Sequence, residues 1–335
     1  MDHTFETPNP PDLSIEIGSG HVEIMAGETN GRTLVTVTGK GAEETTVEQQ
    51  GNTVAVIGPR ARSGFSFSFG SSQLSVRIST PTGSTLSTKL GSADLVATGP
   101  LGACALRSGS GDNELEDVGT LEVTCGSGDL LVGAVAGDAS LRSGSGDLRL
   151  GAVSGDVNSL TGSGATTLGR VDGQVSAKSG SGDVRIDMSG NGAGITTASG
   201  DVQIDRLSGG RVDARTASGD ITVGVSAGLP AWTDIHTMSG SVHSQLAPLG
   251  QPAEGAPFVE LRLRAVSGDI NVGHLREEHP TGPTATQPAA GEPTTAHSAT
   301  DEPTTSHPTA AQHTAGEPTN GDPTTAVHTD PTRTF

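Results

Sequence analysis

The sequence predicts an all-β fold, a single-stranded parallel β-helix (β-solenoid), followed by a disordered C-terminal tail. Two observations predict the solenoid. A Ser-Gly-Asp-apolar motif recurs, for example as Ser145-Gly146-Asp147-Leu148 and Ser199-Gly200-Asp201-Val202. The motif glycines are spaced by 17 to 19 residues from Gly111 to Gly219, and then by 21 and 28. A coil of about 18 residues can bury its apolar face only against the coils above and below it.

Two strands per coil follow from the alternation around each motif glycine. Apolar residues stand two and four positions after the glycine, as Leu148 and Leu150 do, with the polar Arg149 between them. Two more apolar columns stand seven and five positions before it. Half-coil corners fall about nine residues from the main ones, at Gly137, Gly155, Gly173 and Gly209.

An outward column supports the same register. Four positions before the glycine, Arg142, Lys178 and Arg215 alternate with uncharged residues. Stacked coils place equivalent residues about 4.8 Å apart, so alternation keeps like charges two coils apart.

The chain divides into four predicted segments. Residues 1–11 are expected to be a flexible N-terminus, and 12–100 to form β-rich wide first coils and an N-terminal cap. Residues 101–279 are expected to be the solenoid repeats with a C-terminal cap. The tail, 280–335, is rich in Pro, Thr, Ala and His and almost free of apolar residues, so it cannot offset the entropy of ordering.

Composition and charge narrow the function classes. The chain has 49 Gly, no Tyr, one Trp and six Phe, which fits a thin core of small aliphatic residues. A formal net charge of -19 opposes binding to nucleic acid or to an anionic membrane surface. Because no export signal or spanning segment is evident, we expect a cytoplasmic chain, with the surface or envelope as the alternative.

Three phenylalanines, Phe65, Phe67 and Phe69, share one face of a predicted strand. This strand is expected either to lay its aromatic face over the open end of the core or to act as an interaction site that pairs through its edge. The two cysteines, Cys104 and Cys125, occupy different columns of adjacent coils. We expect reduced core thiols, with a disulfide as the alternative.

An aspartate ladder is the strongest candidate for chemistry. Its members stand at one corner of successive coils, and the weak calcium candidates among them are Asp147, Asp183, Asp201 and Asp220. The calcium β-roll rule places Asp two residues after the second glycine, where this chain has buried Leu148. We therefore expect corner N–H groups, in Asx-type turns, to satisfy these carboxylates, and no metal or cofactor site.

Several stretches together resemble a bacterial β-strand-repeat family of unknown function described as "putative adhesin". They are Leu13–Ile24 with its Gly18-Ser19-Gly20 turn, Val76–Gly83, the Ser-Gly-Asp turns, Ala231–Thr237 and Ala265–Ile270. The resemblance covers roughly residues 12–275. It implies a right-handed single-stranded β-helix and brings no catalytic residues.

No nucleophile elbow, phosphate loop or zinc motif occurs, and one Trp provides no platform for sugar stacking. We hypothesise a non-enzymatic solenoid scaffold that presents flat faces to a protein partner. The alternative is an adhesin at the cell surface or envelope, and a more remote one is a polysaccharide-active enzyme.

Overall fold

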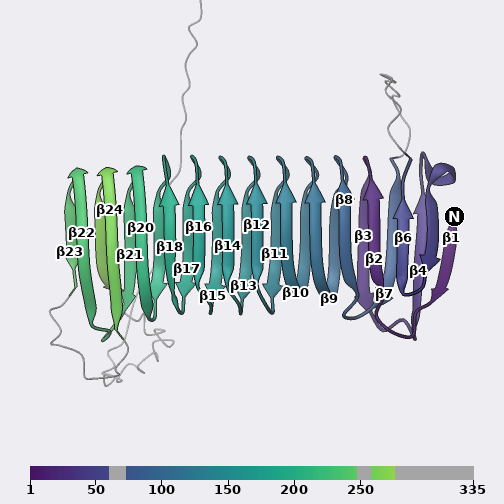
Figure 1. Ribbon diagram of the computed structural model, residues 1–335, viewed down its shortest axis with the longest axis horizontal. Helices are drawn as coiled ribbons and strands as arrows, with labels where there is room; N and C mark the ends of the chain where they lie inside the picture. Colours follow the sequence, from purple (N-terminus) through teal and green to yellow (C-terminus); the bar gives the residue numbers. More distant parts are fainter. Residues whose placement is uncertain (60–72, 247–257, 276–335) are drawn as a thin grey trace, which may run out of the picture. The chain divides into compact units, whose positions relative to one another are not determined.

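The computed structural model describes residues 1–59, 73–246 and 258–275. One compact unit spans Met1–His279. Its described part is all-β apart from a single 3-10 turn, and its strands stack as successive coils (Figure 1), which confirms the predicted β-solenoid. The predicted interaction residues Phe65, Phe67 and Phe69 and the tail 280–335 lie outside the described residues.

The elements in chain order are β1 (Asp2–Glu6), β2 (Asp12–Ile17), β3 (His21–Gly27), β4 (Arg32–Thr38), η1 (Ala42–Glu44), β5 (Thr46–Gln50), β6 (Thr53–Ile57), β7 (Ser75–Pro81), β8 (Thr85–Leu90), β9 (Asp94–Ser108), β10 (Asn113–Cys125), β11 (Leu130–Val135), β12 (Ala139–Ser143), β13 (Leu148–Val153), β14 (Val157–Thr161), β15 (Thr166–Val171), β16 (Val175–Ser179), β17 (Val184–Ser189), β18 (Gly192–Thr197), β19 (Val202–Leu207), β20 (Gly210–Ser218), β21 (Ile221–Ser226), β22 (Ala231–Ser239), β23 (Val242–Gln245), β24 (Val259–Ser267) and β25 (Ile270–Leu275).

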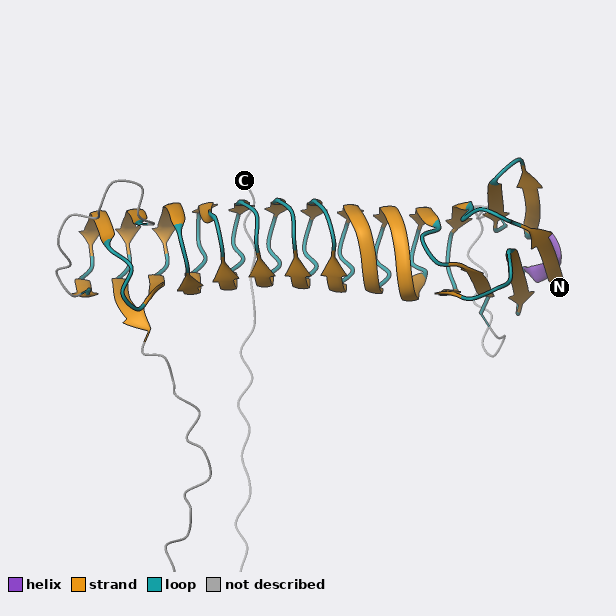
Figure 2. Cartoon of the chain, turned by 90° about the horizontal axis from the view of Figure 1, so that it is seen from below, coloured by secondary structure: helices purple, strands orange, loops and turns teal. Residues whose placement is uncertain are grey.

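Each coil contributes one strand to each of two facing layers, seen edge-on in Figure 2. Sheet 1 runs β1-β4-β7-β3-β9-β10-β11-β13-β15-β17-β19-β21-β25-β23. Sheet 2 runs β5-β6-β2-β8-β9-β10-β12-β14-β16-β18-β20-β24-β22. The long strands β9 and β10 bend from one layer into the other, and coil-to-coil pairings are parallel, as between β13 and β15.

The core is the narrow space between the two sheets. The predicted apolar columns are buried throughout the central coils, for example Leu148 and Leu150 on sheet 1 and Val157 on sheet 2. The main corners need glycine because the coils are stacked closely. A Cβ on Gly164 would collide with the backbone carbonyl of Gly146 on the preceding coil.

The first and last coils do not occupy the ends of the stack. The coil β2–β3 lies between β6–β7 and β8–β9, and the last coil, β24–β25, lies between β20–β21 and β22–β23. The order of the coils in the stack therefore departs from chain order at both ends. Every coil carries equivalent apolar columns, so the period alone does not fix which coil lies beside which.

Insertion of β24 also interrupts the predicted alternation of cations. Arg215 and Arg264 stand on adjacent strands in register. Each has an acidic partner: Asp213 Oδ1 lies 2.9 Å from Arg215, and Asp234 Oδ2 lies 3.6 Å from Arg264. These carboxylates offset the repulsion that the register would otherwise bring.

The N-terminal predictions also need correction. Residues 1–11 were expected to be flexible, but they include strand β1, which pairs antiparallel with β4, and the Met1 amino group donates to Val37 O at 2.7 Å. The segment expected to hold the first coils and the cap contains the coils β2–β3, β6–β7 and β8–β9, and its cap is antiparallel: β4 pairs with β7, and β5 with β6. The boundary at residue 100 falls inside β9.

Candidate functional site

The predicted aspartate ladder is present at the main corner between the sheets. Asp112 Oδ1 accepts the backbone N–H of Asp129 at 2.9 Å, and Asp129 Oδ1 accepts that of Asp147 at 2.9 Å. The donor always lies on the neighbouring coil, so the expected Asx-type turn within one corner is wrong in detail. The carboxylates tie coils together.

The ladder has one missing rung. Asp147 Oδ1 accepts the N–H of Ala165 at 3.0 Å, but alanine offers no side-chain acceptor to the next coil. The ladder resumes where Asp183 Oδ1 accepts the N–H of Asp201 at 2.9 Å, and it continues through Asp220 to Asp269. Two ladder segments result, one on each side of Ala165.

The four calcium candidates are divided between these segments. Asp147 belongs to the first, and Asp183, Asp201 and Asp220 to the second. The Oδ1 atom of each already accepts a backbone hydrogen bond, and Asp147 Oδ2 lies 2.8 Å from an Arg149 nitrogen. Within the described ranges, no group of three His, Cys, Asp or Glu side chains is placed to hold a metal ion.

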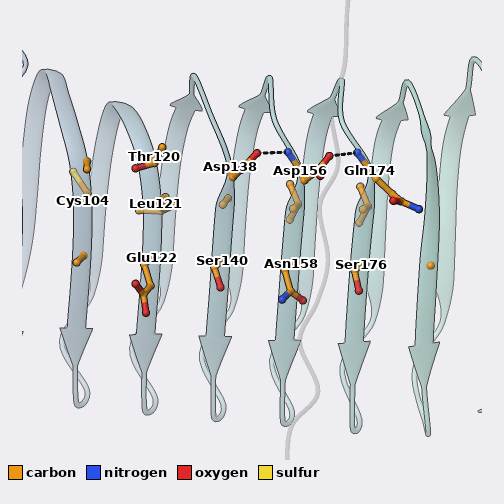
Figure 3. A pocket seen from close by; sticks show the side chains of 16 residues that line it. Cys104, Thr120, Leu121, Glu122, Asp138, Ser140, Asp156, Asn158, Gln174 and Ser176 are labelled. Carbon is orange, nitrogen blue, oxygen red and sulfur yellow. Dashed lines mark hydrogen bonds between the residues drawn. The ribbon is translucent and has the colours of Figure 1, made fainter.

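A second, shorter ladder lies at the half-coil corner. Asp138 Oδ1 accepts the N–H of Asp156 at 2.9 Å, and Asp156 Oδ1 accepts that of Gln174 at 2.8 Å (Figure 3). Sequence reasoning missed this ladder, although the pairs Gly137-Asp138 and Gly155-Asp156 repeat the Gly-Asp signal of the main corner.

This second ladder borders a hollow in the described surface. The hollow has a volume of about 860 Å³ and lies on the outer face of sheet 2, across strands β9 to β18. We call it the sheet 2 groove. Its floor is the outward column six positions before the motif glycine: Ala105, Glu122, Ser140, Asn158, Ser176 and Gly194. These mostly short side chains leave space between the half-corner and the cation column.

The groove has hydrogen-bonding side chains on its four middle coils. Thr120, Asp138, Asp156 and Gln174 follow one margin, and Figure 3 shows Ser140, Asn158 and Ser176 in a second row on the strands. Thr, Ser, Asn and Gln side chains both donate and accept hydrogen bonds. The groove can therefore satisfy the polar groups of an extended chain. The sequence signal for the groove is the column of short outward residues.

The two cysteines are free and buried. Burial raises the pKa of the Cys104 thiol to about 12. Burial also raises the pKa of Cys125, partly offset by a hydrogen bond with Ser143 and reinforced by the negative charge of Asp129. A raised pKa keeps a thiol protonated, which makes it a poor nucleophile and a poor metal ligand.

Comparison with known protein families gives a match that extends over most of the solenoid. The family model described as Toastrack DUF4097 matches residues 11–158 and again 137–291. No curated protein matches the sequence. No helix in the described part of the chain is long and apolar enough to cross a membrane.

Several solved structures are similar at low identity. A "putative adhesin" from Parabacteroides merdae is 13% identical with a TM-score of 0.38, over 82% of this chain and 96% of the other. A "putative adhesin" from Bacteroides fragilis is 14% identical with a TM-score of 0.33, over 82% and 96%. A "putative lipid binding protein" from Parabacteroides distasonis is 10% identical with a TM-score of 0.33, over 82% and 96%.

Proposed function

The chain belongs to the Toastrack DUF4097 family, and from that premise we propose that it is a non-enzymatic β-solenoid scaffold whose sheet 2 groove binds an extended segment of a protein partner. The observation that carries the proposal is the groove itself. It crosses six coils, from Ala105 to Gly194, on a surface of regular strands. A rigid sheet positions side chains more accurately than a loop does.

The dimensions suit a peptide. Six coils at about 4.8 Å per coil give a floor about 24 Å long, which is the length of about seven extended residues. Ser140, Asn158 and Ser176 offer hydrogen bonds to peptide N–H and C=O groups on three successive coils. The floor has no aromatic side chain, so it lacks the stacking surface that a glycan-binding groove would use.

Two features support a non-enzymatic role. The described residues bring together no group of three His, Cys, Asp or Glu side chains placed to hold a metal ion. Both thiols lie in the core with raised pKa values, so neither is an activated nucleophile. We accordingly expect recognition without turnover.

Capture from a native lysate, with matched variants, tests the proposal. Ser140→Trp/Ser176→Trp fills the groove with outward-facing side chains, while Thr167→Trp/Gln203→Trp places the same bulk on the outer face of sheet 1. We expect the wild-type protein and the sheet 1 variant to retain the same partner, and the groove variant to lose it. Equal capture by all three would contradict the groove as the site. Turnover of a glycan or ester panel by the pure protein would contradict the non-enzymatic role.

A further inference from the structure

The coil formed by β22 and β23 is the last in the stack, and it is uncovered on one side. Within the described residues, β22 pairs only with β24, and β23 only with β25. Val242 on β23 is 46% exposed, whereas Ile270 and Ile221, in the same inward column, are fully buried. An open coil of this kind leaves a row of backbone donors and acceptors without a strand partner.

Exposed apolar side chains gather at the same end. Trp232 is 54% exposed and Met238 is 84% exposed, and Phe258 and Val266 beside them are about half exposed. Along the central coils, from β10 to β21, the large apolar side chains exposed among described residues are Leu131 and Leu160 alone. A concentration of apolar surface on an otherwise polar solenoid indicates a contact surface.

The backbone polarity of β22 is fixed by its pairing with β24. The N–H of Val259 donates to Pro230 O at 2.9 Å, and Ala231 stands opposite Val259 in the parallel register. Parallel strands direct alternate residues toward each neighbour. The N–H and C=O groups of Ala231, Thr233, Ile235 and Thr237 therefore face the free edge.

We propose that two copies of this chain join end to end through antiparallel pairing of their β22 strands about a two-fold axis at Ile235. The strand is self-complementary about that residue. Ile235 stands opposite its own copy, and Thr233 stands opposite Thr237, so the residues with free N–H and C=O groups form the hydrogen-bonded pairs. Outward side chains meet in the closer, non-hydrogen-bonded pairs.

These outward pairs are chemically matched. Asp234 of one copy meets His236 of the other, and Trp232 meets Met238, an aromatic ring beside a thioether. Within one copy, His236 Nε2 already lies 2.9 Å from Asp234 Oδ1, and Arg264 lies 3.6 Å from Asp234 Oδ2. Two-fold pairing adds a second Asp-His pair to this group without placing like charges directly opposite.

The result is a closed dimer rather than a fibre. A two-fold interface uses the same surface on both copies, so it is saturated after one association. The opposite end of the solenoid is covered by the antiparallel strands β1, β4 and β5, which offer no matching parallel coil. The dimer would carry two sheet 2 grooves and could bind a bivalent partner with increased avidity.

Charge exchange tests the pairing by sedimentation velocity of the full chain over a range of concentrations. Asp234→Lys places Lys opposite His236, and His236→Asp places two aspartates opposite each other. We expect each single substitution to weaken dimerisation at least tenfold. The double substitution Asp234→Lys/His236→Asp restores opposite charges across the axis and is expected to recover dimerisation to within about threefold of wild type. Circular dichroism melts establish that all three variants are folded. A monomeric wild-type chain at 100 μM, or a double variant no better than the single ones, would overturn the proposal.

Cysteine crosslinking tests the register. In a non-hydrogen-bonded antiparallel pair, Cα atoms lie about 4.5 Å apart, within disulfide range. Under mild oxidation we expect a disulfide-linked dimer only when the Trp232→Cys chain is mixed with the Met238→Cys chain. Each variant alone should remain uncrosslinked, as should a mixture of Leu131→Cys and Leu160→Cys chains. Crosslinking of either variant with itself, or none in the mixture, contradicts the pairing about Ile235.

Discussion

The two ends of the solenoid differ in how the outermost parallel coil is covered. At the N-terminal end, β4 and β5 pair antiparallel with the outermost parallel coil, and the inward residues Val56 and Ile78 are fully buried. At the C-terminal end, the outermost coil has no such cover among the described residues, and its inward residues Ile235 and Val242 are only partly buried. The repeat builds both coils alike, so the burial of a column residue depends on what lies beyond its coil.

Introducing a charge into an inward column is expected to give the largest difference in stability between the two ends. Ile78→Asp places an unpaired carboxylate in the covered core and is expected to cost about 4 kcal/mol of the free energy of unfolding. Val242→Asp leaves its carboxylate in contact with water and is expected to cost less than about 1 kcal/mol. Urea denaturation followed by circular dichroism measures both. Similar losses at the two positions would mean that the open coil is covered in solution. Because a dimer would also cover this coil at high protein concentration, the measurement is made at low micromolar concentration.

Thiol reactivity provides a second test of the difference between the buried central coils and the open last coil. Burial holds the pKa of Cys104 at about 12, so at pH 8 about one thiol in ten thousand is ionised. We expect the cysteine introduced by Val242→Cys to react with a disulfide reagent at least about a thousandfold faster than Cys104. Equal rates would show that the central coils open as readily as the last one.

The same pKa shift makes the free energy of unfolding depend on pH. A thiol whose pKa is raised from 9.0 to about 12 in the folded state stabilises the fold below about pH 9, and this contribution is lost as the pH rises toward 12. Cys104→Ala should remove that part of the alkaline loss of stability. An unchanged alkaline profile in the variant would contradict the assignment.

The burial of residues in the central coils could be predicted from the sequence. The strand period of two and the coil period of about 18 together assign each residue to an inward or an outward column. The order of the outer coils could not be predicted, because Val212 and Leu261 offer the same inward column to any neighbour. One signal of the open coil was present. Thr233 and Ser244 bring polar groups into columns that are otherwise largely apolar, as suits a coil that meets water on one side.

The candidate site was predicted in part for a similar reason. The aspartate positions follow from the repeat, but the donor of each hydrogen bond lies on another coil, and the sequence does not show how closely the coils approach. The sheet 2 groove depends on the relative lengths of outward side chains in neighbouring columns. Ala105, Ser140 and Ser176 are short and uncharged, so neither the apolar columns nor the charges of the sequence indicate a hollow at their positions.

The aspartate ladder also distinguishes the ends. Asp201→Ala removes the acceptor of the Asp220 N–H, 2.8 Å away, and should cost about 1 kcal/mol, whereas Asp201→Asn keeps an acceptor and should cost less. Asp269→Ala removes the acceptor of the Ser241 N–H and should mainly speed hydrogen exchange in β23.

Millimolar calcium should raise the melting temperature no more than magnesium at equal ionic strength. A calcium-specific rise that is lost in Asp183→Asn/Asp201→Asn would identify a cation site instead.

The smallest effect concerns the missing rung between the two ladder segments. The segment from Asp94 to Asp147 belongs to coils near the covered end, and the one from Asp183 to Asp269 reaches the open coil. Ala165 is half-buried at the corner between them, and an amide oxygen at this position would accept the Asp183 N–H as its neighbours accept theirs. We expect Ala165→Asn to add about 0.5 to 1 kcal/mol, or about 1 to 4 °C in melting temperature. Ala165→Val provides similar bulk without an acceptor and should give no gain, and Ala165→Asp should gain less than Asn because its charge adjoins Asp147 and Asp183. If valine stabilised the chain as much as asparagine does, filling of space rather than the inter-coil hydrogen bond would explain the gain.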